Sequence, residues 1–226
     1  EDSRGTVWIG TRKGLERVVF KDEKKRMIER FHHCRHNEEH EDNSVYHMGE
    51  DKEGNLWICC SNQGGLQKFI FEEDGITPRE IKRYRNDSNN PQSISSDWVM
   101  SITEDKKGIL WIGTWAGGLN RFDPVKGSFD HFKPDDSNTS SINSENVYWI
   151  VEDEKGAIWF GTYGGGLNRI TPESKYSDSP EFQNFTHNPD NSYSISNNRI
   201  RSVMIDQSGL LWLGTLGNGV DYINPN

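Results

Sequence analysis

"LWIGTWAGGLNRFDP", residues 110–124, decides the fold because close copies of it recur along the chain. Related segments begin at Val7, Leu56, Ile158 and Leu211. Successive copies of the first tryptophan are 49, 54, 48 and 53 residues apart. A sequence period of this size is typical of proteins built from repeated structural units. The repeats are centred on Trp8, Trp57, Trp111, Trp159 and Trp212.

Each of these tryptophans is preceded by the same frame, Asp-x-x-Gly-x-x-Trp, as in "DKKGILW" at residues 105–111. The frame predicts a tight hairpin, because the Asp carboxylate accepts hydrogen bonds from backbone N–H groups ahead of it and the Gly adopts a positive φ. We expect such residues, which recur in every repeat, to build the scaffold.

The segments around this turn predict four short strands per repeat. Apolar runs precede it at residues 45–50, 99–104, 147–152 and 200–205, and the tryptophan segment follows it. A third strand such as "GLNRF" stops at Asp-Pro, because proline cannot continue a strand ladder. A fourth strand carries an aromatic residue near its end, in the segments at 27–33, 80–86, 128–134 and 181–187. Four antiparallel strands, repeated, form the blade of a β-propeller.

The predicted fold is therefore an all-β propeller of about five four-stranded blades, forming a single domain over residues 1–226. The chain begins at the second strand of one blade and stops after the third strand of another, which gives 18 strands. Because 18 is not a multiple of four, we expect a fragment of a larger propeller. Five blades that close imperfectly are the alternative.

The charge balance argues against two classes of partner. The chain carries 26 Lys and Arg against 35 Asp and Glu, a net charge of −9. Nucleic acids and anionic membranes need a basic surface, so we expect neither as the main partner. Apolar runs such as residues 147–151 are far shorter than the roughly 20 residues that span a bilayer, and no signal peptide opens the sequence.

Residues that differ between repeats at exposed positions are the candidates for binding. In a blade, the turn between the second and third strands and the loop entering the first strand lie on one face. Flat aromatic rings beside planar polar groups suit a sugar, which needs stacking as well as donors and acceptors; aromatics that pack only on adjacent loops are the alternative. The candidates are Trp115, Tyr163, Trp98, Asp97, Glu145, Asn146, Arg199 and Arg12.

The cysteines and histidines give weaker signals. Three cysteines without regular spacing do not predict a disulfide framework, and we interpret Cys59 and Cys60 as small strand residues. A cluster of four histidines and one cysteine offers the residue types that bind zinc but matches no zinc-finger spacing. We therefore expect this segment to be a solvated loop, with no metal and no cofactor. Its members are His32, His33, Cys34, His36 and His40.

The segment "SENVYWIVEDEKGAIWFGTYGGGLNRITP", residues 144–172, resembles the repeat of two-component regulator propellers. The resemblance covers nearly the whole chain. It implies the periplasmic sensor domain of a hybrid two-component system of the Bacteroidetes type, with a histidine kinase elsewhere in the full-length protein. It also implies recognition of an oligosaccharide or other small polar ligand, homodimerisation, and no enzymatic activity in this portion.

Two other functions stay open from the sequence. One is a protein-interaction scaffold. The other is a metal-dependent enzyme similar to streptogramin lyases, whose blades carry a comparable G-x-I-W-F motif and which use His, Glu and a divalent metal. The candidate face here offers little histidine, since His131 and His187 fall in fourth-strand regions. No nucleophile elbow, His-Glu-x-x-His or phosphate-binding loop is present in the sequence.

Overall fold

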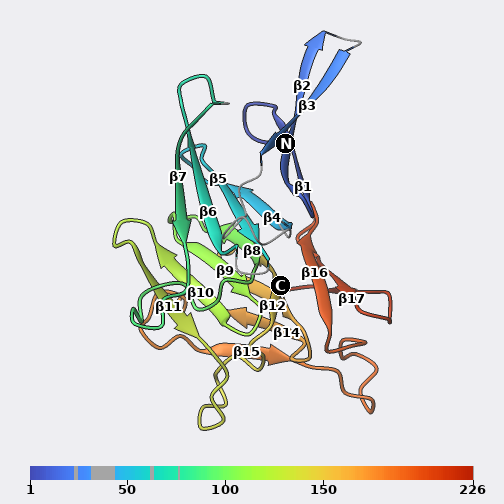
Figure 1. The fold of residues 1–226 in the computed structure, drawn as a ribbon. Coiled ribbons are helices and arrows are strands. Elements are labelled where there is room, and N and C mark those ends of the chain that lie inside the picture. Colours follow the sequence, from blue (N-terminus) through green and yellow to red (C-terminus); the bar gives the residue numbers. More distant parts are fainter. Residues whose placement is uncertain (23–24, 32–43, 62–63, 76, 226) are drawn as a thin grey trace.

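The computed structural model describes residues 1–22, 25–31, 44–61, 64–75 and 77–225, and in this part of the chain 18 strands form five antiparallel sheets (Figure 1). Within the same residues there is no helix long and apolar enough to cross a membrane. We number the sheets as blades 1 to 5 in chain order. The predicted all-β fold and the division into three, four, four, four and three strands are confirmed.

The strands of each blade follow one another in sequence and in space. Blade 1 contains β1 (Val7–Thr11), β2 (Gly14–Asp22) and β3 (Lys25–Phe31). Blade 2 contains β4 (Val45–Glu50), β5 (Leu56–Cys60), β6 (Leu66–Phe71) and β7 (Pro78–Tyr84). Blade 3 contains β8 (Val99–Glu104), β9 (Leu110–Thr114), β10 (Gly118–Asp123) and β11 (Ser128–Phe132). Blade 4 contains β12 (Val147–Glu152), β13 (Ile158–Thr162), β14 (Leu167–Ile170) and β15 (Phe182–Phe185), and blade 5 contains β16 (Ile200–Ile205), β17 (Leu211–Thr215) and β18 (Val220–Ile223).

Successive blades pack through their first strands. β4 contacts β8, β8 contacts β12, and β12 contacts β16. The later strands of each blade fan outward from this inner row (Figure 1). This is the radial arrangement of a propeller, in which each sheet covers the face of its neighbour.

One hydrogen bond recurs in all five blades and joins the turn to the core. The turn Asp accepts the indole N–H of the tryptophan six residues later on its Oδ2, at 2.7–3.0 Å. Its Oδ1 accepts the backbone N–H four residues ahead, at 2.8–3.1 Å. The turn glycines have φ between 78° and 88°, as the sequence predicts. The indole bond was not predicted from the sequence.

The tryptophans place the core in layers between blades. Trp57 of blade 2 packs with Phe122 and Phe129 of blade 3, and Trp159 of blade 4 packs with Leu213 of blade 5. Full burial of one such side chain contributes about 1.5–3 kcal/mol. Stability is therefore distributed over the blade interfaces rather than held in one central cluster.

His47 and Trp149 meet across the inner strand β8. Their rings, from blades 2 and 4, lie 4.7 Å apart at 74°. The backbone N–H of Ile102 in β8 donates to His47 Nδ1 at 3.3 Å. Burial lowers the pKa of His47 to about 4, so the imidazole is neutral and Nδ1 is the acceptor at neutral pH.

The two adjacent cysteines differ in state. Cys59 is a fully buried free thiol whose pKa is raised by burial. Cys60 is a buried strand residue of β5 as predicted, but it is also disulfide-bonded. That bond lies beyond what spacing within the sequence could predict.

We expect Asp153→Asn to destabilise the fold, because an amide cannot accept both the Ala157 N–H and the Trp159 indole N–H as a carboxylate does. Loss of a hydrogen bond to a charged group costs about 1.5–3 kcal/mol. Urea unfolding followed by tryptophan fluorescence measures this. Asp190→Asn, at an exposed loop position, is the matched control and should change the free energy of unfolding by less than about 0.5 kcal/mol. Equal effects would contradict the role of the turn.

Stability should fall as the pH is lowered from about 6.5 to about 4. His47 binds a proton near pH 6.5 when unfolded but only near pH 4 when folded, so over this window the unfolded state holds more protons and is favoured. The loss is on the order of 3 kcal/mol. His47→Gln, which keeps an acceptor for Ile102 but does not titrate, should flatten the profile. Urea unfolding at a series of pH values tests this, and identical slopes for both proteins would contradict it.

Candidate functional site

Main-chain hydrogen bonds hold the candidate loops together on one rim. In blade 3, Trp115 N donates to Trp98 O at 2.9 Å, and in blade 4, Tyr163 N donates to Asn146 O at 2.9 Å. Neighbouring blades are joined in the same way, since Gly118 N donates to the carbonyl of Glu145 at 2.8 Å. The turns and loops that vary between repeats therefore form one continuous surface.

Four rings on this rim form a group that we call the aromatic patch: Trp98, Trp115, Tyr148 and Tyr163. Trp115 is its centre. Its ring centroid lies 5.7 Å from Trp98, 5.7 Å from Tyr148 and 5.6 Å from Tyr163. Each of the four side chains is partly exposed. The patch thus presents apolar ring surface to solvent across blades 3 and 4.

Two arginines from blade 5 border the aromatic patch. The guanidinium carbon of Arg199 lies 4.9 Å from the Tyr163 ring centroid, and that of Arg201 lies 4.5 Å from the Tyr148 centroid. Both arginines are exposed. Stacking on a ring orients a guanidinium while leaving its donors available for other partners.

Tyr148 and Arg201 were not among the predicted site residues. Each is the second residue of its inner strand, where the pairing register shifts between Val147 and Trp149 in β12 and between Ile200 and Ser202 in β16. A bulge leaves one residue unpaired and redirects its side chain. Strict alternation along the sequence does not show where such a shift occurs.

Two local features at the patch are energetically unfavourable. The indole N–H of Trp98 is buried and has no hydrogen-bond partner in the described part of the chain, which costs about 1–3 kcal/mol. Ala116, next to Trp115, has φ 59°, whereas Gly164 and Gly217 occupy the equivalent turn position. A left-handed non-glycine residue costs about 1–2 kcal/mol. Such costs concentrate at functional sites.

The loop acids have different roles although they align in the repeats. Asp97 Oδ1 accepts the N–H of Asn86 at 2.7 Å and so fixes the loop. Asn86 lies 11 residues before Asp97. At the same distance before Glu145 the chain has Pro134, which has no N–H to donate. Glu145 is exposed, and its carboxylate forms no hydrogen bond or ion pair with any described residue. Asp97 is thus part of the scaffold, whereas Glu145 is available to a ligand.

The remaining predicted residues divide in a similar way. Asn146 Oδ1 accepts the N–H of Ala116 at 2.9 Å and supports the turn that carries Trp115. Arg12 is exposed in the turn between β1 and β2 and contacts none of the aromatic patch within the described residues. The structure therefore gathers Trp98, Trp115, Glu145, Asn146, Tyr163 and Arg199 at the patch but leaves Arg12 apart.

The described residues hold no group of three or more His, Cys, Asp or Glu side chains placed to bind a metal ion. The predicted histidine cluster, residues 32–40, lies outside the described residues.

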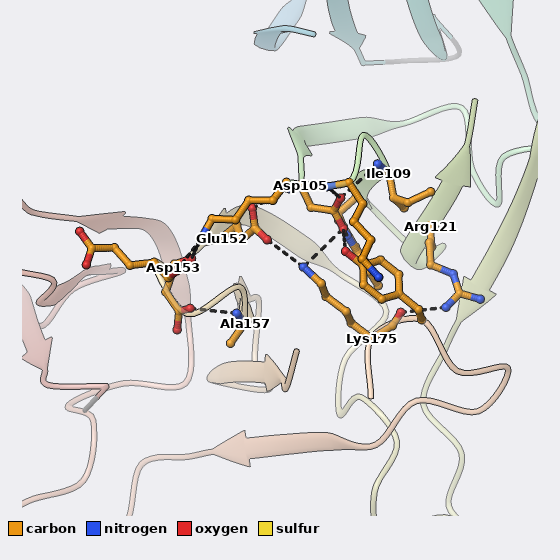
Figure 2. A network of polar contacts seen from close by, with 12 residues as sticks. Asp105, Ile109, Arg121, Glu152, Asp153, Ala157 and Lys175 are labelled. Atoms are coloured by element: carbon orange, nitrogen blue, oxygen red, sulfur yellow. Dashed lines mark hydrogen bonds and ion pairs between the residues drawn. The ribbon is translucent and has the colours of Figure 1, made fainter. Parts of the chain in front are cut away.

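The opposite rim carries a polar network around Lys175 (Figure 2). Lys175 belongs to residues 171–181, which connect β14 to β15 and which we call the strap. Its Nζ lies 2.8 Å from Glu152 Oε1 and 3.5 Å from Asp105 Oδ2. Burial opposes its charge, but these two carboxylates outweigh burial and raise the pKa of Lys175. Tyr176 donates to Asp105 Oδ2 at 2.9 Å, so the strap ties blade 4 to the turn of blade 3.

Four segments match the model of the two component regulator propeller family: residues 40–62, 93–116, 141–164 and 194–217. Each covers an inner strand, the Asp turn and the tryptophan strand of blades 2 to 5. No curated protein matches the chain significantly.

Solved structures with the same fold include extracellular domains of two hybrid two-component systems from B. thetaiotaomicron. BT4673 is 22% identical with a TM-score of 0.63, and BT3049 is 18% identical with a TM-score of 0.60. The chain is covered to 99% in both and spans 35% and 39% of the solved chains of those extracellular domains. Virginiamycin B lyase from Staphylococcus aureus is 19% identical with a TM-score of 0.63, over 98% of this chain and 67% of that enzyme.

These neighbours are similar in fold, and the short share of the two-component proteins that is covered agrees with a part of a larger propeller assembly. The repeat frame, the Asp–Trp hydrogen bonds and the four family matches lead to one assignment. Blades 2 to 5 each contain a segment that matches the two component regulator propeller repeat.

Proposed function

We propose that this propeller is the extracytoplasmic, ligand-recognising part of a two-component signalling protein, and that the aromatic patch binds an oligosaccharide. The observation that carries the proposal is the exposed group of four rings bordered by Arg199 and Arg201. The family of the repeats and the extracellular domains among its structural neighbours support a sensory role outside the cytoplasm.

The patch offers what a sugar requires. Trp115 and Tyr163 supply ring faces for C–H surfaces, while the Glu145 carboxylate accepts from hydroxyl groups and the Arg199 guanidinium donates to them.

In this proposal the propeller recognises its ligand without transforming it, and signalling output resides in other parts of the whole protein, including a histidine kinase. Two propellers pairing as a homodimer would place two patches in one receptor. The patch contains no histidine, which favours recognition over the metal-dependent lyase chemistry considered from the sequence.

Trp115→Ala should weaken glycan binding by about five- to thirtyfold, since stacking contacts of an aromatic ring contribute about 1–2 kcal/mol. A glycan array followed by calorimetry with the best ligand measures this. Tyr193→Ala removes a ring that is 97% exposed and outside the patch, and should leave the affinity unchanged. An array without any bound glycan, together with a stable dimer, would favour the interaction scaffold instead; turnover abolished by a chelator would favour a lyase.

Glu145→Ala and Asp97→Ala separate binding from folding at aligned positions. Asp97→Ala leaves the Asn86 N–H without its acceptor and should lower the free energy of unfolding by about 1–2 kcal/mol. Glu145→Ala breaks no side-chain bond and should change stability by less than about 0.5 kcal/mol while reducing glycan affinity severalfold. Urea unfolding and calorimetry on both variants test this, and an unchanged affinity for Glu145→Ala would exclude its role as a ligand acceptor.

A further inference from the structure

A cavity of about 250 Å³ lies between blades 2 and 3 on the rim opposite the aromatic patch. We call it the groove. Its walls include Asp51 and Lys68 of blade 2, Glu104 and Leu110 of blade 3, and Val125 in the short turn of residues 124–127. Nothing in the proposed sugar recognition uses this space.

A glutamate at the end of the inner strands β4, β8 and β12 links neighbouring blades. Glu50, Glu104 and Glu152 each accept, on Oε2, the backbone N–H that follows the turn Asp of the preceding blade, at 2.6, 2.7 and 3.0 Å. The three carboxylates therefore occupy equivalent positions at successive interfaces. The partners of their other carboxylate oxygen, Oε1, can therefore be compared directly.

The second oxygen of Glu104 lacks the partner that its equivalents have. Glu50 Oε1 accepts the Ser3 hydroxyl at 2.6 Å, and Glu152 Oε1 lies 2.8 Å from Lys175 Nζ. Glu104 Oε1 has no hydrogen bond or ion pair within the described residues. Burial raises the pKa of Glu104, and the attraction of Lys52 only partly offsets it. Glu104 is thus a partly buried acceptor that is short of a cation.

The interface between blades 3 and 4 shows what such a carboxylate binds when a chain segment fills the space beside it. There the strap places the Lys175 ammonium on Glu152, and Arg121, from β10, donates to the backbone carbonyls of Lys175 and Ser177 at 2.8 and 2.9 Å (Figure 2). The filling group is therefore a lysine side chain on a segment folded in tight turns, whose carbonyls pair with a basic residue.

The groove repeats these elements without the strap. In the aligned repeats, Glu104 is at the position of Glu152, Asp51 at that of Asp105, and Lys68 at that of Arg121. Lys68 Nζ lies 3.0 Å from Asp51 Oδ2 at the wall of the groove. The connection that would reach this space is only residues 124–127 in blade 3, whereas residues 171–181 form the strap in blade 4. Asp51 is therefore already paired with an ammonium group, and Glu104 Oε1 is the acceptor of the groove that no chain segment occupies among the described residues.

We propose that the groove binds a lysine residue of a peptide segment that resembles the strap. The ammonium pairs with Glu104 Oε1, the alkyl stem lies along Leu110 and Val125, and Lys68 donates to a peptide carbonyl. Glu53 occupies the position of Lys107, whose ammonium lies 4.1 Å from the Tyr176 ring centroid in the filled interface. Recognition in the groove therefore depends on the lysine rather than on a following aromatic ring.

The strap sequence itself supplies the probe. A peptide "PESKYSDS", residues 172–179, capped at both ends, should bind the 226-residue protein and shift amide resonances of residues 104–110 in two-dimensional NMR. Replacing its lysine by norleucine removes only the charge and should weaken binding by at least about tenfold, as expected for a charge-assisted hydrogen bond. Equal binding of the two peptides, or no binding at millimolar peptide, would overturn the proposal.

Glu104→Gln tests the acceptor from the protein side. The amide oxygen still accepts the Lys52 N–H, so the interface keeps its backbone link, but affinity for the lysine peptide should fall by at least about tenfold. Glu80→Gln, on the exposed surface of β7, is the matched control and should bind normally. Unchanged affinity in Glu104→Gln, or resonance shifts confined to residues 171–181 because the peptide displaces the strap, would refute the proposal. Glycan binding at the opposite rim is scored separately, so either idea can fail alone.

Discussion

The hydrogen bond from a tryptophan indole to a turn aspartate is the interaction on which the rest of this structure depends. It fixes a surface turn and a core side chain with one carboxylate, so a polar group and a large apolar ring are positioned together. Several N–H groups converge on Asp51 and on Asp105, and these hydrogen bonds lower the pKa of both carboxyls against the effect of burial. The hydrogen bond between the turn Asp and the indole thus sets the orientation of each tryptophan ring that packs against the next blade.

With the blades constructed alike, departures from the repeat become informative. Pro134 removes one backbone donor and thereby frees the Glu145 carboxylate, whereas Asp97 stays bound to its loop. A long connection in blade 4 fills one interface with Lys175, while a short one in blade 3 leaves the neighbouring interface open. Each blade interface is an internal reference for the others, since the same positions occur with and without a partner.

The sequence was sufficient to predict the blades because turn and strand signals are local. The apolar runs at residues 45–50, 99–104, 147–152 and 200–205 coincide with β4, β8, β12 and β16. The site was only partly predictable. Tyr148 and Arg201 depend on register shifts in pairing, and Lys175 reaches the turn of blade 3 through a connection that does not belong to the repeat. Such contacts arise from tertiary geometry, which periodicity does not encode.

The His47 contact has a consequence for the free edge of an inner strand. β8 pairs with β9 on one side only, and its Ile102 N–H is covered by an imidazole rather than by another strand. An uncovered edge is a template for adding a foreign strand. The acceptor that covers this edge is neutral in ordinary solution and is lost on protonation, so resistance to strand addition is itself coupled to acidity. One backbone donor at the edge of β8 is therefore held by a side chain whose ability to accept depends on pH.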